Sequence, residues 1–219
     1  RTPSASPPPD QRAKPVDGRS SRSNLRVGIP RVLNLWSTHQ FWVGFFAALG
    51  IDGRRLVFSS DTSEEQGRQY GKGRGTVDCC YPVKCITGHY GELLFGQREK
   101  LDIVFSPMIY NLPSFMSGHV AKTLICPRVM AAPENIKAGF MKERDVFAEQ
   151  GIRYCSPFVS LDEPKLVPKQ LWEGMRDVIP GLTAEEIGRA VDAGFRALAD
   201  FNLRLRQKSR QVLQWCARE

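Results

Sequence analysis

The sequence LDIVFSP at residues 101–107 decides the fold of this chain of 219 residues. Its four large apolar residues form a short run that ends at a proline. Such a run is typical of a strand buried on both faces, because a half-buried strand would alternate apolar and polar residues. Proline ends the pairing and turns the chain out of the sheet. Four further short runs are predicted to be strands, at residues 25–30, 54–59, 123–127 and 151–155.

Helical patterns separate these strands. They cover residues 35–49, a short helix from Asp61 or Ser63 toward Tyr70, and the stretches of about 82–99 and 133–149. Strands that alternate with helices predict an α/β fold with an open, mostly parallel, Rossmann-like sheet flanked by helices. Ligands of such sheets bind beyond the carboxyl ends of the strands, so the residues that follow each strand are the candidates for function.

The two ends of the chain differ from this body. Residues 1–24 are rich in proline, serine and arginine and have almost no large apolar side chains, so we predict a disordered linker or tail. Residues 25–180 are predicted to form the α/β domain. Within residues 181–219, apolar side chains recur at spacings of three and four up to about residue 216, which predicts one long C-terminal amphipathic helix.

Charge and hydropathy exclude several classes of protein. The net charge is 31 − 23 = +8, but residues 1–25 contribute 5 − 2 = +3 and residues 188–219 contribute 7 − 3 = +4. The body is therefore nearly neutral and lacks the basic stripe typical of a nucleic-acid-binding protein. The most apolar stretch, residues 41–51, is about half the ~20 residues that a membrane span needs. Neither nucleic acid nor a membrane is expected as a partner.

Cysteines lie near the ends of the predicted strands. Cys126 and Cys155 follow two strands, and Cys79 and Cys80 precede a helix whose first residue is predicted to be Pro82. The positive end of a helix dipole favours the thiolate, which is the form of cysteine that binds metals. The topology therefore predicts that Cys80 and Cys126 converge at one edge of the sheet.

The spacing of these thiols leaves two interpretations open. No C-x2-C pair of a zinc ribbon is present, whereas single cysteines on separate loops suit an iron–sulfur cluster with an open or non-protein ligand. The alternative is an inert core role, which we assign to Cys85 and Cys216, because cysteine is among the most buried residue types. His89 is open to a role beside the site or to an ordinary place in the core.

Several common catalytic motifs are absent from the sequence. It contains no G-x-x-x-x-G-K-[ST] phosphate loop and no G-x-G-x-x-G after a strand. A G-x-S-x-G nucleophile elbow and an H-E-x-x-H zinc motif are missing as well. We therefore assign no catalytic residue, and we expect no ATP hydrolysis by this chain alone.

A set of short motifs resembles a known family. The motifs are VGIPR at 27–31, FW at 41–42, FF at 45–46, CYPVK at 80–84, GH at 88–89, Pro107, and CP at 126–127. Over about residues 25–215 the chain resembles a domain of uncharacterised function found in proteins related to activators of 2-hydroxyacyl-CoA dehydratases. In that family the domain follows ATPase units of the benzoyl-CoA reductase activator type, and it is akin to the dehydratase component that carries an iron–sulfur cluster.

The resemblance implies an anaerobic, cytoplasmic electron-transfer domain in an ATP-dependent reductase or 2-hydroxyacyl-CoA dehydratase system. Cys80 and Cys126 would then ligate a [4Fe–4S] cluster, with Cys79 and Cys155 as further candidates for metal ligands. ATPase activator units would supply the electron, and a 2-hydroxyacyl-CoA thioester or another small molecule would receive it.

The same resemblance implies that residues 181–219 lead to a second lobe, present in cis or in trans, which contributes further residues to the site. This chain, a fragment of a larger protein in that interpretation, would hold half of a shared site. The alternative is a cluster-free domain of the same fold that serves as an interaction module or as an acyl-CoA- or nucleotide-binding module.

Overall fold

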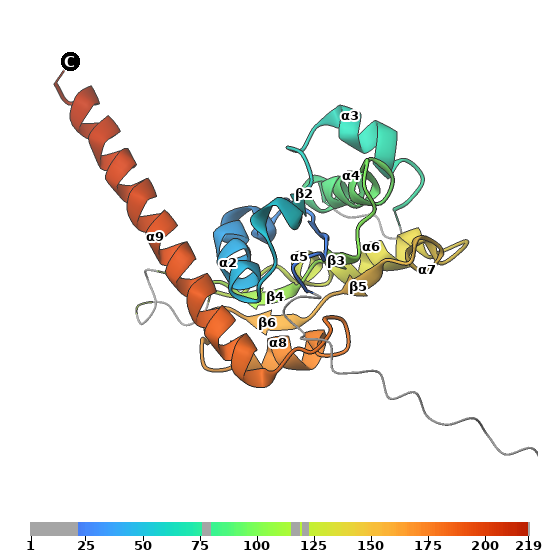
Figure 1. The fold of residues 1–219 in the computed structure, drawn as a ribbon. Coiled ribbons are helices and arrows are strands. Elements are labelled where there is room, and N and C mark those ends of the chain that lie inside the picture. The colour runs from blue at the N-terminus through green and yellow to red at the C-terminus, as the bar shows by residue number, and fades with distance from the viewer. Residues whose placement is uncertain (1–21, 76–79, 115–118, 120–122, 219) are drawn as a thin grey trace, which may run out of the picture.

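The computed structural model describes residues 22–75, 80–114, 119 and 123–218 (Figure 1). A four-stranded sheet with the order β2-β1-β3-β5 lies at its centre, and all three neighbouring pairs are parallel. Its strands are β1 (Val27–Ile29), β2 (Leu56–Phe58), β3 (Ile103–Phe105) and β5 (Arg153–Cys155). The predicted α/β class with a mostly parallel sheet is therefore confirmed.

Parallel neighbours need crossover connections, and helices supply them. The helices are α2 (Asn34–Ala48), α3 (Glu64–Gln66), η2 (Gly67–Gly71), α4 (Tyr81–Phe95), α5 (Pro127–Met130), α6 (Ala132–Phe140), α7 (Val146–Gln150), α8 (Val167–Met175) and α9 (Ala184–Cys216), with a short 3₁₀ turn η1 (Gly53–Arg55) before β2. The η2 segment is a π-helix, a rare conformation that is frequent at functional sites.

Alternating side chains of the strands divide the core into two parts. Ile103 and Phe105 of β3 join an apolar cluster with α2, α8 and α9, which we call the α2-face core. Val104, between them, joins a second cluster with α4, α6 and α7, which we call the α4-face core. Because successive residues of a strand point to opposite faces, the two clusters lie on opposite sides of the sheet.

Aromatic residues of α2 fill the α2-face core. Phe41, Trp42, Phe45 and Phe46 are fully buried. The ring centroids of Trp42 and Phe46 lie 4.9 and 5.0 Å from that of Phe105 on β3, in edge-to-face arrangements. Such pairs contribute packing energy beyond the area they bury. This helix therefore anchors the sheet from one side.

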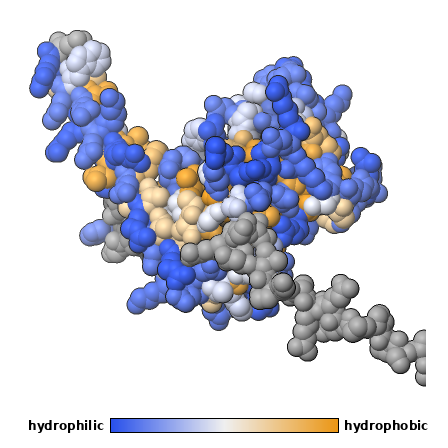
Figure 2. Space-filling model, in the orientation of Figure 1, coloured by the Kyte–Doolittle hydropathy of each residue, from blue (hydrophilic) through white to orange (hydrophobic). Residues whose placement is uncertain are grey.

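Helix α9 confirms the predicted long C-terminal helix. It begins at a capping box, in which Glu186 N–H donates to Thr183 Oγ1 and Thr183 N–H donates to the Glu186 carboxylate. The first half packs closely on α2, because a Cβ added at Gly194 would lie 2.9 Å from the Phe41 ring. Its second half projects from the body, and there Trp215 is 62% exposed (Figures 1 and 2).

Arg22 joins the start of the described chain to α9. Its guanidinium is buried and donates to the Glu186 carboxylate at 3.1 Å and to the carbonyl of Gly181. Arg22 falls within the segment predicted as a tail, and residues 1–21 of that prediction lie outside the described residues. The folded body thus includes at least the last residues before β1.

The prediction of a fourth strand at residues 123–127 was wrong. Leu124 forms only an isolated antiparallel bridge with Asn111, and Pro127 begins α5. A short apolar run cannot by itself distinguish a strand from the entry to a helix. In its place the structure has a second parallel pair, β4 (Met108–Asn111) with β6 (Phe158–Ser160), that the sequence analysis did not identify.

The helix predicted at residues 133–149 is two helices. α6 ends at Phe140, and α7 begins after Asp145, whose carboxylate accepts a hydrogen bond from Ala148 N–H at 3.0 Å. An aspartate at this position caps a new helix better than it continues an old one. The intervening residues 141–145 form a loop, and part of this loop lines a cavity that is described below.

Candidate functional site

The carboxyl ends of the four parallel strands lie along one edge of the sheet. Pro30, Ser59, Ser106 and Ser156 follow β1, β2, β3 and β5 directly. Helix α2 begins nearby at Leu33, whose φ of 52° is unusual for a residue that is not glycine. Strained backbone of this kind gathers at functional sites, and this edge is where parallel sheets bind ligands.

Cys80 lies at the start of α4. It is the N-cap residue, it is exposed, and no side chain caps the helix there. Its carbonyl accepts hydrogen bonds from the N–H groups of Val83 and Lys84 at 3.0 and 3.1 Å, with Pro82 in the first turn. The thiol is therefore accessible at the positive end of a 15-residue helix.

Cys126 repeats this local structure at the start of α5. It is the exposed N-cap residue, Pro127 is the first helical residue, and no side chain caps the helix. Its carbonyl accepts hydrogen bonds from the N–H groups of Val129 and Met130 at 2.9 and 3.0 Å. Two of the predicted ligands thus share one conformation, an accessible thiol at a helix entry.

Both helix entries rest on the same core. Val83 belongs to the α4-face core, and Val129 packs against it. Each valine lies three residues after its cysteine, so each cysteine begins the helical turn whose valine faces this core. Ile86 and Val129 also line one small cleft of about 20 Å³, enough for a single water molecule. The fold therefore brings the Cys80 and Cys126 entries to one side of the sheet.

The other predicted ligands are placed differently. Cys155, at the end of β5, is 2% exposed and belongs to the α2-face core, where its thiol lies 3.6 Å from the carbonyl oxygen of Gly174. Burial raises the pKa of this thiol to about 12. The structure thus does not bring Cys155 together with Cys80 and Cys126. Cys79 lies outside the described residues.

A metal centre would need more ligands than the described residues supply. In that part of the chain, no group of three or more histidine, cysteine, aspartate or glutamate side chains is placed to hold a metal ion. Cys80 and Cys126 are soft, accessible donors of the kind that iron–sulfur clusters use. Two thiols do not complete such a site, so any remaining ligands would have to come from outside the described ranges.

His89 lies in a buried polar network beside the end of β2. Its Nδ1 is 2.7 Å from Ser59 Oγ, and its Nε2 is 2.9 Å from Thr62 Oγ1. Burial lowers the pKa of His89 from 6.5 to about 4, although the Glu92 charge acts in the opposite direction. The imidazole is therefore neutral at pH 7 and holds the loop after β2 in place.

Glu92 and Gln66 extend this network one turn along α4. The Glu92 carboxylate accepts hydrogen bonds from Ser60 Oγ at 2.8 Å and from Gln66 Nε2 at 2.6 Å. This network was not expected from the sequence, because hydrogen bonds within it join residues that lie 26 to 30 positions apart. Its members lie either on α4 or in the loop and the short helix α3 that follow β2.

A larger cavity of about 440 Å³ is lined by residues of η2 and of the first turns of α4. Tyr81, Cys85, Arg68 and Lys72 are among its lining residues. The sequence analysis assigned Cys85 to the core, and the structure places it half-buried at this cavity. No sequence motif indicated this cavity, because its shape depends on the π-helical conformation of η2.

Comparison with known proteins identifies the family. Residues 26–219 match the family described as the CoA enzyme activase uncharacterised domain. The chain belongs to this family. Curated proteins and solved structures give no match. The activase-related resemblance of the sequence motifs is thereby confirmed.

Membership of this family supports only a general statement of function. A CoA enzyme activase domain is expected to work with other components of an enzyme system. Within the described residues, no helix is both long and apolar enough to cross a membrane. The family description includes no metal, substrate or catalytic residue.

Proposed function

We propose that this domain is an iron–sulfur electron-transfer module of a CoA activase and 2-hydroxyacyl-CoA dehydratase system, with Cys80 and Cys126 as thiolate ligands. The observation that carries the proposal is their shared environment. Both are exposed N-cap residues with a proline in the first helical turn, and both helices rest on the α4-face core. Cys79 remains a candidate for a third ligand.

The chain's own residues would set the properties of this site. When bound, a [4Fe–4S] cluster would accept and release one electron at low potential. Cys80 lies at the positive end of α4, and the dipole of this helix stabilises the negative charge of a thiolate. Val83 and Ile86 lie buried beneath the helix entry and make the inner side of the site apolar.

The proposal includes partners. ATPase activator units would supply the electron, and a second lobe, in cis or in trans, would provide the remaining ligands. The placement of Cys80 and Cys126 in an open position supports this, because a site shared between two bodies must be accessible from one of them. An acyl-CoA thioester or another small molecule would accept the electron.

The test is to express the full polypeptide anaerobically and to measure bound iron, acid-labile sulfide and visible absorbance. The wild-type protein is expected to carry iron and sulfide and to be brown. Cys80→Ser and Cys126→Ser should each lose most of the colour, because each removes one thiolate.

The control variant is Cys216→Ser, since Cys216 is also an exposed thiol but lies on the projecting half of α9. It should retain the colour. Equal loss in all three variants, or colourless wild-type protein, would refute the cluster and leave the cluster-free module of the same fold.

A further inference from the structure

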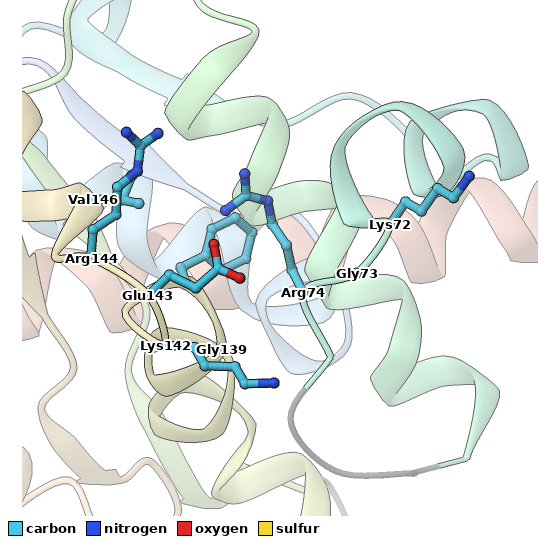
Figure 3. Close-up of a pocket in the computed structure, with 9 residues that line it drawn as sticks. Lys72, Gly73, Arg74, Gly139, Lys142, Glu143, Arg144 and Val146 are labelled. Atoms are coloured by element: carbon cyan, nitrogen blue, oxygen red, sulfur yellow. The ribbon is translucent and has the colours of Figure 1, made fainter.

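A second, more basic cavity of about 480 Å³ lies between the segment after η2 and the loop that joins α6 to α7 (Figure 3). Its lining includes Lys72, Arg74, Phe140, Lys142, Glu143 and Arg144. This volume lies within the usual range of about 300–1,000 Å³ for small-molecule sites. No cysteine among the described residues lines the cavity, so its chemistry is separate from that of the proposed cluster.

Arg74 is held in place by two aromatic rings. Its guanidinium carbon lies 4.7 Å from the ring centroid of Phe95 and 4.9 Å from that of Phe140. Its backbone N–H donates to the carbonyl of Gly71 at 3.2 Å. An aromatic ring accepts no strong hydrogen bond, and the N–H groups of a guanidinium bind oxyanions in pairs of hydrogen bonds.

Arg74 forms no ion pair with a carboxylate of the described residues. Glu143 comes nearest to that role, because Figure 3 shows its carboxylate on the side of the cavity that faces Arg74. Glu143 is exposed, so its side chain is free to turn toward solvent.

The loop after α6 adds further positive charge. Lys142 and Arg144 flank Glu143, and the Nε of Arg144 lies 3.5 Å from Glu149 Oε2. The ammonium of Lys72 points away from the cavity in Figure 3, so we do not count it. Arg74, Lys142 and Arg144 carry three positive charges against the two carboxylates of Glu143 and Glu149, so a surplus of one positive charge remains at the cavity.

We infer that this cavity binds a small molecule through a diphosphate group, with Arg74 as the main contact and Lys142 and Arg144 as supporting charges. The arginine edge suits phosphate oxygens, which it binds in a bidentate manner. In the free protein the Glu143 carboxylate lies where the anion would bind. A diphosphate is favoured over a single carboxylate because its higher negative charge is attracted more strongly to a cavity of net positive charge.

The test uses inorganic pyrophosphate as the probe and isothermal titration calorimetry of the full chain without iron. A Kd of about 1 mM or tighter is expected at low salt, which is typical of a small anion in an open site. Lys142→Ala should weaken binding about tenfold, because a hydrogen bond to a charged group contributes on that order. ADP should bind at least as tightly, since it carries the same diphosphate group.

Two variants make the assignment specific. Glu143→Gln should tighten binding severalfold, because it removes the competing carboxylate and keeps the shape of the side chain. Lys208→Ala removes the same charge from the exposed part of α9, far along the chain from this cavity, and should leave the Kd unchanged. All three substituted side chains are exposed, so folding is expected to be preserved.

Three results would overturn the inference. They are no detectable pyrophosphate binding, an equal loss in Lys142→Ala and Lys208→Ala, or no gain in Glu143→Gln. None of these measurements involves iron or the thiols. A failure here would therefore leave the electron-transfer proposal standing, and a colourless protein would not affect this inference.

Discussion

The two faces of the central sheet carry different kinds of residue. On one face, the α2-face core is closed by aromatic side chains such as Trp42 and Phe105, and even its cysteine, Cys155, is buried. On the other face, α4 presents an accessible thiol at Cys80, a buried polar network around His89, and the borders of two cavities.

We therefore expect the α2 face to determine the stability of the domain and the α4 face to carry its binding and reactive groups. Substitutions on the α2 face should reduce the free energy of unfolding, because they remove tightly packed apolar contacts. Substitutions at exposed positions of the α4 face should change binding or reactivity with little effect on stability. Two cysteines show this contrast: Cys155 is buried in the α2-face core, whereas the Cys80 thiol is accessible to solvent.

The largest effect is expected from opening the α2-face core. Trp42→Ala removes a fully buried indole whose ring packs on Phe41 and Phe105. It should lower the free energy of unfolding by about 3–5 kcal/mol, the usual cost of such a truncation. Chemical denaturation measures this. Trp36→Ala, at an indole that is 52% exposed, is the matched control and should cost under about 1 kcal/mol. Similar losses in both would mean that the α2 face is not the stabilising one.

The contact of η2 with α4 should be the next most sensitive. A Cβ at Gly91 would lie 2.3 Å from the backbone oxygen of Tyr70, so Gly91→Ala must displace the π-helix. We expect a loss of about 1–3 kcal/mol, as for other overpacked sites. Thermal and chemical unfolding measure it.

Gly188 provides the control for that change. It lies in α9, and a Cβ there meets nothing within 4 Å. Gly188→Ala should therefore stabilise the protein by roughly 0.5–1 kcal/mol, since alanine favours a helix interior over glycine. If Gly91→Ala were also stabilising, the close approach of η2 and α4 would be in error.

The His89 network predicts a pH dependence of stability. The unfolded state takes up a proton at pH 6.5, whereas burial delays this to about pH 4 in the folded state. This contribution is therefore fully present above pH 6.5 and is lost as the pH falls toward 4. Denaturation at pH 7 and pH 5 should show a drop for the wild type that is smaller in His89→Gln. An equal drop in both proteins would assign the dependence to other groups.

Chemical labelling of the thiols should have the smallest effect on stability, but it should distinguish the two faces clearly by their reactivity. Under native, metal-free conditions, iodoacetamide should modify Cys80 and Cys126 and should spare Cys155, because burial raises the pKa of the Cys155 thiol to about 12. Mass spectrometry of peptides after timed labelling measures this. Rapid native modification of Cys155 would contradict the closed character of the α2 face.

The sequence was sufficient for the main sheet because β1, β2 and β3 are short apolar runs with clear ends, and β5 lies between Gly151 and Pro157. It failed at residues 123–127, where the same kind of run leads into α5 and contributes only the Leu124–Asn111 bridge. The β4–β6 pair was missed because its strands directly follow β3 and β5 and look like their continuations.

For the candidate site, the sequence indicated Cys80 and Cys126 through the prolines beside them, and both are accessible at helix entries. It could not decide which way Cys155 faces, since that depends on the register of β5 with β3, where Cys155 pairs with Phe105. The basic cavity was also hidden, because it joins residues about 70 positions apart through the packing of Arg74 on Phe140.

The ion pair of Arg22 with Glu186 bears on where this domain can be shortened. Burial raises the pKa of Glu186, but the hydrogen bond and charge of Arg22, together with Thr183, outweigh it and hold that pKa below its usual value. A recombinant version that starts at residue 25, the first residue of the predicted α/β domain, would lack this counter-charge at the cap of α9. Boundaries for expression and crystallisation should therefore begin upstream of Arg22.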